Sequence, residues 1–162
     1  MSALGCDGFD SVEKSIFALP AAVGSTPEQI LRYARTIAVV GASRDPNKSA
    51  ASVPRVLQQR GFRIIPVNPF ADTIIGERAY KSLADIPEKV DVVDVFRPSA
   101  EAPGVARQAA AIGARALWLQ QGITSDEARR IAEAAGMDYV EDLCMAVEAA
   151  LLRIRVPRDP AA

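Results

Sequence analysis

The chain has 162 residues, a length that suits one ordinary domain with its own core and is too short for two. Apolar residues make up 49% of it and charged residues 24%, a balance typical of a globular protein and not of a disordered or fibrous one. Its formal net charge of −1 argues against a nucleic-acid surface, and no apolar run reaches the roughly 18 residues that a membrane span requires.

Histidine and cysteine usage restricts the chemistry further. Histidine is absent, which removes the commonest general base and the commonest metal ligand. The two cysteines, Cys6 and Cys144, lie far apart in the sequence, so we expect neither a disulfide framework nor a metal site. Together with an N-terminus that lacks the pattern of a signal peptide, this usage indicates a cytoplasmic protein.

A start signal for a helix opens the ordered pattern. Thr26 is suited to the N-cap, Pro27 to the first helical position, and Gln29 completes a capping box. The preceding residues show no clear periodicity, and the chain ends in a proline-marked tail. We therefore expect three segments: an N-terminal extension at 1–24, a single domain at 25–155 and a C-terminal tail at 156–162.

Short β-rich runs alternate with helix-length segments from Thr36 onward, with one less regular stretch after the second run. Strands alternating with helices are typical of a parallel sheet with right-handed crossovers. The sequence therefore predicts an α/β fold, a doubly wound parallel sheet of five or six strands in a single domain. The expected strands are 36–41, 62–68, 90–96, 114–120 and 137–142, with a short one near Ala79, and the later helices are expected at about 47–60, 99–112, 125–135 and 143–153, with one helical turn before Pro87.

Ligands of an open parallel sheet bind beyond the carboxyl ends of its strands, so the turns that follow the strands are the candidate site. Gly41 allows a tight turn close to a ligand, and the helix that follows offers free N–H groups at its start. Arg44 and Lys48, near this turn, would add charge-assisted hydrogen bonds, a combination suited to phosphate. The alternative interpretation is that Gly41 only turns the chain and that both cations are solvated.

The same turn disfavours ordinary NAD binding. A dinucleotide fingerprint requires G-x-G-x-x-G, but the run from Gly41 to Pro46 keeps one of the three glycines. NAD binding also calls for an acidic residue at the end of the second strand, where this chain has Asn68 and Pro69. Both departures favour a more anionic nucleotide, with additional phosphate on or near its ribose.

Six motifs in order also point to a family: VVGASRDP, GFRIIPVNP, YKSLADIP, VDVVDVFRPS, LWLQQGI and EDLCMAVE. Over about Thr36 to Leu152 the chain resembles the stand-alone coenzyme A-binding proteins, a family similar to the N-terminal nucleotide-binding domain of the succinyl-CoA synthetase α-subunit. The resemblance implies a Rossmann-like fold with coenzyme A as its ligand. The chain departs from the family at Leu143 and Ala149, where arginine and histidine are frequent, and without the phosphohistidine of the synthetase we expect no complete thiokinase.

The resemblance also implies which part of the ligand each turn contacts. The turn at 41–43 would lie near the diphosphate, with Arg44 and Lys48 as basic neighbours, and the turn at 120–123 near the pantetheine arm. The adenosine end would lie against the ends of the second and third main strands. The full set of implied coenzyme A-binding residues is Gly41, Ala42, Ser43, Arg44, Lys48, Val67, Asn68, Pro69, Phe96, Arg97, Pro98, Gln120, Gln121, Gly122 and Ile123.

The expected function is binding of coenzyme A or an acyl derivative, with no catalytic residue and no metal. Two alternatives stay open: an NAD(P)-linked oxidoreductase or small acyl-CoA-handling enzyme that uses Cys144, and a regulatory or scaffolding module with a vestigial nucleotide site. Cys144 itself is either a thiol that forms a mixed disulfide or thioester with the coenzyme, or a small buried residue. Asp94 is expected to orient Arg97 or to cap a loop, with a catalytic acid as the alternative, and Trp118 is expected to lie in the core.

Overall fold

The computed structural model describes residues 24–157, so the expected N-terminal extension and C-terminal tail lie outside the described residues apart from Gly24, Val156 and Pro157. The elements are α2 (Pro27–Tyr33), β1 (Thr36–Val40), α3 (Ser49–Gln59), β2 (Arg63–Val67), β3 (Thr73–Ile74), β4 (Glu77–Arg78), β5 (Val92–Val95), α4 (Ala102–Ala111), β6 (Ala116–Leu119), α5 (Asp126–Ala134), β7 (Asp138–Val140) and α6 (Met145–Leu151). Short 3-10 turns lie at Leu83–Asp85 and Ser99–Glu101.

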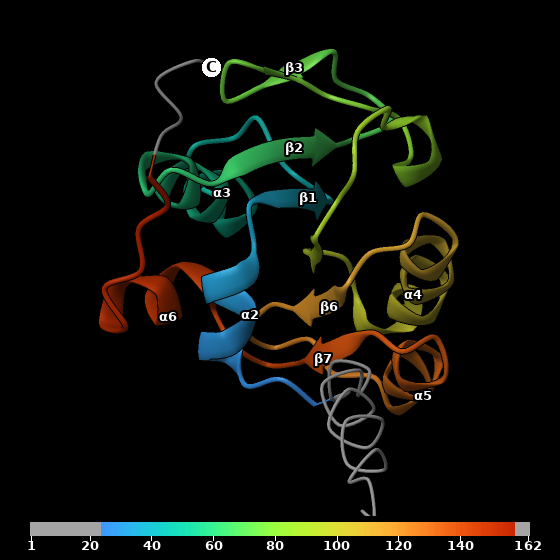
Figure 1. Cartoon of the computed structure of the whole chain (residues 1–162). Helices are drawn as coiled ribbons and strands as arrows, with labels where there is room; N and C mark the ends of the chain where they lie inside the picture. The colour runs from blue at the N-terminus through green and yellow to red at the C-terminus, as the bar shows by residue number, and fades with distance from the viewer. Residues whose placement is uncertain (1–23, 158–162) are drawn as a thin grey trace, which may run out of the picture.

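Within residues 24–157, five parallel strands form one sheet in the order β2-β1-β5-β6-β7 (Figure 1). The chain passes from β1 through α3 to β2, and then returns to the other side of β1 at β5. The strand order therefore reverses between β1 and β5, which is where ligands of such sheets bind. The prediction of a doubly wound parallel sheet is confirmed.

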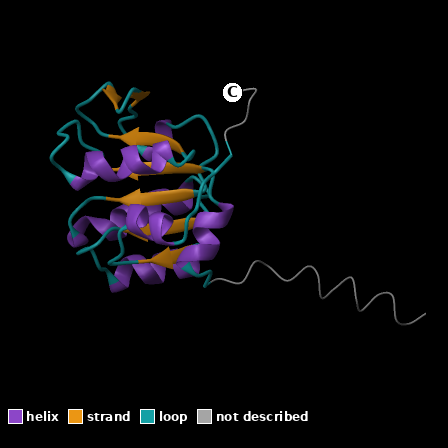
Figure 2. Ribbon diagram, turned by 90° about the vertical axis from the view of Figure 1, so that its left-hand side faces the viewer, coloured by secondary structure: helices purple, strands orange, loops and turns teal. Residues whose placement is uncertain are grey.

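Helices cover both faces of this sheet (Figure 2). α4 and α5 pack together on one face, whereas α2, α3 and α6 cover the other; Figure 1 shows α4 and α5 at the right of the strands and α3 and α6 at the left. Side chains along each strand alternate between the two layers: Ile37 and Val39 pack toward α3 and α6, and Ala38 packs toward α4 and α5. Strands covered on both faces are apolar throughout, which explains the continuous apolar runs of the sequence.

The buried tryptophan, the capping box and the later helices lie where the sequence predicts them. Trp118 is fully buried, and its Nε1 donates a hydrogen bond to the Leu143 carbonyl oxygen over 2.8 Å. Thr26 Oγ1 accepts from the Gln29 N–H over 3.2 Å, and Gln29 Oε1 accepts from the Thr26 N–H over 2.9 Å, so the predicted capping box is present. The later helices lie within their expected ranges and are shorter than those ranges.

No helix among residues 24–157 has the length and apolar character needed to cross a membrane.

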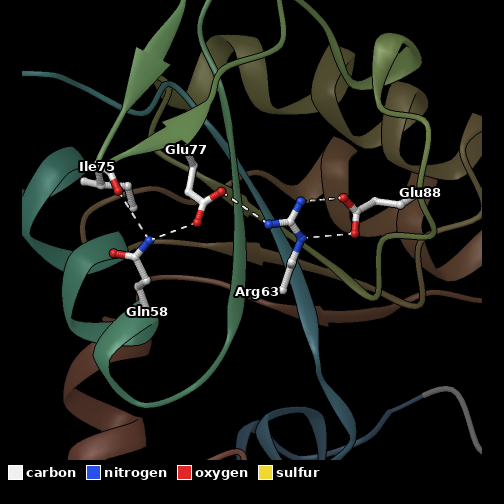
Figure 3. Close-up of polar contacts among 5 residues, drawn as sticks. All are labelled: Gln58, Arg63, Ile75, Glu77 and Glu88. Atoms are coloured by element: carbon white, nitrogen blue, oxygen red, sulfur yellow. Dashed lines mark hydrogen bonds and ion pairs between the residues drawn. The ribbon is translucent and has the colours of Figure 1, made fainter. Parts of the chain in front are cut away.

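The less regular stretch after β2 forms a hairpin in which β3 pairs antiparallel with β4. Its tight turn places Ile75 at a φ of 49°, a conformation that β-branched residues rarely adopt. A polar cluster holds the hairpin on the domain (Figure 3): Gln58 Nε2 of α3 donates to the Ile75 carbonyl oxygen and to Glu77, each over 3.3 Å. Arg63, the first residue of β2, pairs with Glu77 over 3.2 Å and with Glu88 over 2.8 Å. The hairpin is therefore anchored at the amino end of β2, away from the turns that follow the strands.

Candidate functional site

Two cavities open along the edge of the sheet where β1, β2, β5 and β6 end. Consecutive residues divide them, because Arg97 lines the larger cavity and Phe96 the smaller one. Neighbouring residues of an extended chain point to opposite faces. The larger cavity accordingly lies against α4, and the smaller one lies against α3 and the start of α6.

The larger cavity has a volume of about 760 Å³, which is within the usual range for small-molecule sites. It lies between the ends of β1 and β2 and the first turns of α4. The sequence-predicted residues that line it are Gly41, Val67, Asn68, Pro69 and Arg97. Other lining residues were not predicted from the sequence, among them Phe70, Lys81 and Arg107.

Gly41 ends β1 in a conformation that requires glycine. Its φ is 85°, and a Cβ at this position would lie 2.8 Å from both the Phe96 carbonyl oxygen and the Arg97 Cδ. Its N–H donates to the Val67 carbonyl oxygen over 3.1 Å. In the structure this glycine lets the end of β1 pack directly against the segment that divides the two cavities.

Asn68 braces the turns that follow β1 and β2. Its Nδ2 donates to the Ala42 carbonyl oxygen over 2.9 Å, and its Oδ1 accepts from the Phe70 N–H over 2.7 Å. An aspartate would supply no donor to Ala42, which is a physical reason for an amide here. The hydrogen bond from the Phe70 N–H fixes the backbone at Phe70. The ring of this residue is 90% exposed and lines the larger cavity. Such a ring offers a face on which a nucleotide base can stack.

Three cations and two carboxylates line the larger cavity. Arg97 donates to Glu101 over 2.6 Å, and Arg107 donates to Glu127 over 2.7 Å. The hydrogen bond from Arg97 holds the pKa of Glu101 below its usual value. Lys81 has no carboxylate partner in the described part of the chain. An entering anion can therefore pair with Lys81 without displacing a carboxylate.

The predicted cations of the first turn lie outside these two cavities. Arg44 and Lys48 are exposed on the loop between β1 and α3, and Lys48 is the N-cap residue of that helix. The Ser43 N–H donates to the Ala50 carbonyl oxygen over 3.1 Å, which closes the turn. The predicted residues that line neither cavity are Ala42, Ser43, Arg44, Lys48, Pro98 and Gly122.

The smaller cavity has a volume of about 250 Å³. The sequence-predicted residues that line it are Phe96, Gln120, Gln121 and Ile123. Ser49 and Val53 of α3 and Cys144, the N-cap residue of α6, complete its lining. Cys144 is half-buried with a free thiol, so it faces a cavity and is not sealed in the core.

A buried carboxyl group lies beneath this cavity. Asp94 is 0% exposed and Gln120 is 4% exposed, and Gln120 Nε2 donates to Asp94 Oδ1 over 2.7 Å. Asp94 Oδ2 has no hydrogen-bond partner within residues 24–157. Burial raises the pKa of Asp94 to about 7, against the lowering effect of hydrogen bonds from Gln120 and the Val95 backbone. The prediction that Asp94 orients Arg97 or caps a loop is wrong, because Asp94 lies on the α3 face under Gln120 and Arg97 pairs with Glu101.

A doubly wound sheet whose cavities lie beside the reversal of strand order defines a Rossmann-like ligand-binding protein. This chain belongs to the family described as CoA binding domain, which it matches over residues 35–150. The resemblance to stand-alone coenzyme A-binding proteins is thereby confirmed.

Relatives of similar length extend this result. The uncharacterized protein YneT of Bacillus subtilis is 37% identical over 126 residues, which are 78% of this chain and 93% of YneT. The solved structure of cell-free ID.343 from Thermus thermophilus is 38% identical with a TM-score of 0.75, over 79% of this chain and 99% of that one. A hypothetical protein from Pyrococcus horikoshii OT3 is 35% identical with a TM-score of 0.76, over 83% of this chain and 96% of that one.

A longer enzyme contains a matching segment. The ADP-forming acetate–CoA ligase II of Archaeoglobus fulgidus is 35% identical over 105 residues, which are 64% of this chain and 16% of the ligase. The chain is thus related to the coenzyme A-binding domains of ADP-forming acyl-CoA synthetases and corresponds to a small part of such an enzyme.

Proposed function

We propose that this chain binds coenzyme A or an acyl derivative reversibly in the cytoplasm and has no acyl-transfer machinery of its own. The observation that carries the proposal is the pair of cavities divided at Phe96 and Arg97 in a member of the CoA binding domain family. The larger cavity has cations and an exposed aromatic ring, whereas none of the described residues that line the smaller one is an aspartate, glutamate, lysine or arginine. A ligand with a phosphorylated nucleotide at one end and an uncharged arm at the other matches this division.

The nucleotide end of the ligand belongs in the larger cavity. Phe70 offers an exposed ring to the adenine base, and Asn68 holds the backbone that presents it. Lys81 pairs with the phosphate on the ribose, because Arg97 and Arg107 already have carboxylate partners.

The diphosphate crosses the turn that follows β1. Arg44 and Lys48 lie exposed near this turn, and the start of α3 adds N–H groups and the positive end of its dipole. The arm then passes from this turn into the smaller cavity beside Gln120.

Thermal unfolding with coenzyme A, acetyl-CoA, NADH and NADPH, each added separately, tests this function. A ligand at 100 times its Kd adds about 2.7 kcal/mol to the free energy of unfolding, which corresponds to a rise of roughly 5–10 °C in Tm for a domain of this size. We expect that rise with coenzyme A or acetyl-CoA. Stabilisation by NADPH without stabilisation by coenzyme A would overturn the proposal, and no shift with any of the four would favour a module with a vestigial site.

A further inference from the structure

The smaller cavity is built for an uncharged arm. Val53, Phe96 and Ile123 give it apolar walls, and its polar groups are the amides of Gln120 and Gln121, the Ser49 hydroxyl and the Cys144 thiol. None of these lining residues is an aspartate, glutamate, lysine or arginine. The cavity therefore suits a chain of methylene and amide groups that ends in sulfur, and it does not suit a phosphate.

Gln120 presents an unused acceptor to this cavity. Its Nε2 is held by Asp94, and no donor among residues 24–157 reaches its Oε1. The residue is 4% exposed, but its Oε1 is not among the fully buried atoms, so this oxygen is open to the cavity that the residue lines. An amide with one end fixed and the other open to a cavity can accept from a donor that arrives with a ligand, such as an amide N–H of the arm.

The thiol of Cys144 lies in the same lining as this acceptor. We propose that the smaller cavity is a thiol–disulfide exchange site in which Cys144 takes one half of the symmetrical disulfide of coenzyme A, an inference that rests on the proposed function. The nucleotide in the larger cavity and the amide contact at Gln120 bring the sulfur of the bound half against Cys144. The other half leaves along the open edge of the sheet.

The exchange needs no separate oxidant. The Cys144 thiolate attacks one sulfur of the coenzyme disulfide, the S–S bond of that disulfide breaks, and a Cys144–coenzyme disulfide forms. The departing coenzyme thiolate takes up the proton that Cys144 lost. Attack by a second reduced thiol reverses the step and frees Cys144.

Intact mass spectrometry of the full chain, reduced and then freed of reductant, tests the inference with coenzyme A disulfide as the probe. We expect a gain of one coenzyme A less two hydrogens, located on the peptide that contains Cys144 and removed by dithiothreitol. The Cys6→Ser variant should keep the adduct, and Cys144→Ser and Cys144→Ala should lose it. An adduct that survives both substitutions at Cys144 would overturn the inference.

Selectivity separates a built site from a merely reactive cysteine. At equal concentration we expect exchange with coenzyme A disulfide to be at least about tenfold faster than exchange with glutathione disulfide, because the bound nucleotide positions the sulfur. Gln120→Leu should slow the reaction with coenzyme A disulfide by a larger factor than the reaction with a small aromatic disulfide, which has no arm to contact the amide. Equal rates for the coenzyme and glutathione disulfides would overturn the inference.

Failure of the inference is distinguishable from failure of the proposed function. Cys144→Ser should still show the thermal shift with reduced coenzyme A, because the contacts of the larger cavity are intact. A wild-type chain that is stabilised by coenzyme A but forms no adduct with its disulfide would overturn the exchange alone. A wild-type chain that is not stabilised by any coenzyme A derivative would overturn both.

Discussion

Asp94 is a carboxylic acid on the central strand of an apolar sheet. It lies in register between Val39 of β1 and Trp118 of β6, with Gln120 as its hydrogen-bond donor. Burial is the largest cause of its raised pKa of about 7, compared with an ordinary value of 3.8. A group with a raised pKa holds its proton more tightly in the folded chain than in the unfolded one. The free energy of unfolding should therefore fall as the pH rises from about 4 to about 7, and the effect should level off above that range.

We expect Asp94→Asn to remove this pH dependence, because the amide has a similar shape and no charge at any pH. Relative to the wild type, the free energy of unfolding of the variant should rise by about 2–3 kcal/mol between about pH 5 and pH 8, since one pH unit below the folded pKa is worth about 1.4 kcal/mol. Urea unfolding of both proteins at the two pH values measures the difference. Parallel pH profiles would show that Asp94 is ionised across the range.

Lys81 is expected to distinguish coenzyme A from dephospho-coenzyme A, which lacks the ribose phosphate. A charge-assisted hydrogen bond contributes about 1.5–3 kcal/mol, so Lys81→Ala should weaken coenzyme A binding by about 10- to 150-fold and dephospho-coenzyme A binding much less. Isothermal titration calorimetry with both ligands measures the two losses. The control is Lys89→Ala, which removes an exposed lysine that lines neither cavity and should change neither affinity. Equal losses of affinity for both ligands would show that Lys81 does not bind the ribose phosphate. Arg44 would then be the next candidate.

At the scale of elements, the start of α2 is joined to the edge strand β7 by one carboxylate. Asp138 accepts hydrogen bonds from the N–H groups of Gly24 over 3.1 Å and Ser25 over 2.9 Å, and from the Tyr33 hydroxyl over 3.0 Å. The guanidinium of Arg115 lies 3.6 Å from the centre of the Tyr33 ring. Burial by itself raises the pKa of Asp138, but the hydrogen bonds from Ser25, Gly24 and Tyr33 outweigh it and hold the pKa below its ordinary value.

The stabilisation from Asp138 is therefore present at neutral pH and is lost as the pH falls through the lowered pKa. Asp138→Asn should reduce stability at pH 7 by about 1–2 kcal/mol, or roughly 2–8 °C in Tm, and by much less near pH 3. Thermal unfolding of the variant and the wild type at both pH values measures this. Asp72→Asn, at an exposed position, is the matched control and should have little effect. An Asp138→Asn loss of the same size at both pH values would contradict the assignment.

The fold of the whole molecule could be predicted because its main determinants are local. Continuous β-rich runs, the capping box at Thr26 and the glycine that ends α3 each mark an element, and their alternation selects a parallel sheet. Gly61 shows what local signals leave out. Its φ is 98°, which is typical of a glycine that follows a helix. A Cβ there would also collide with the carbonyl oxygen of Val156, near the other end of the domain, and the residues around Gly61 in the sequence do not indicate this contact.

The candidate site could be predicted only in part. Residues at strand ends could be named because parallel strands end along one edge. Their division between two cavities could not, because it depends on which face each side chain takes beyond the last residue of its strand, as Phe96 and Arg97 show. Phe70 and Lys81 were missed because they flank the β3–β4 hairpin, and a bridge back to β2 returns the chain to the sheet edge.

The peptide bond between Phe96 and Arg97 lies at the boundary between the larger and the smaller cavity. Inserting one residue between β5 and this bond would exchange the two side-chain directions, turning the ring toward the ion pairs and the guanidinium toward the cysteine. The two cavities share no lining residue, so a substitution of one lining residue alters one cavity and leaves the boundary between them in place. In the proposed binding mode, recognition of the base and phosphates can thus diverge among such proteins independently of the sulfur end, provided that the length of this short segment is kept.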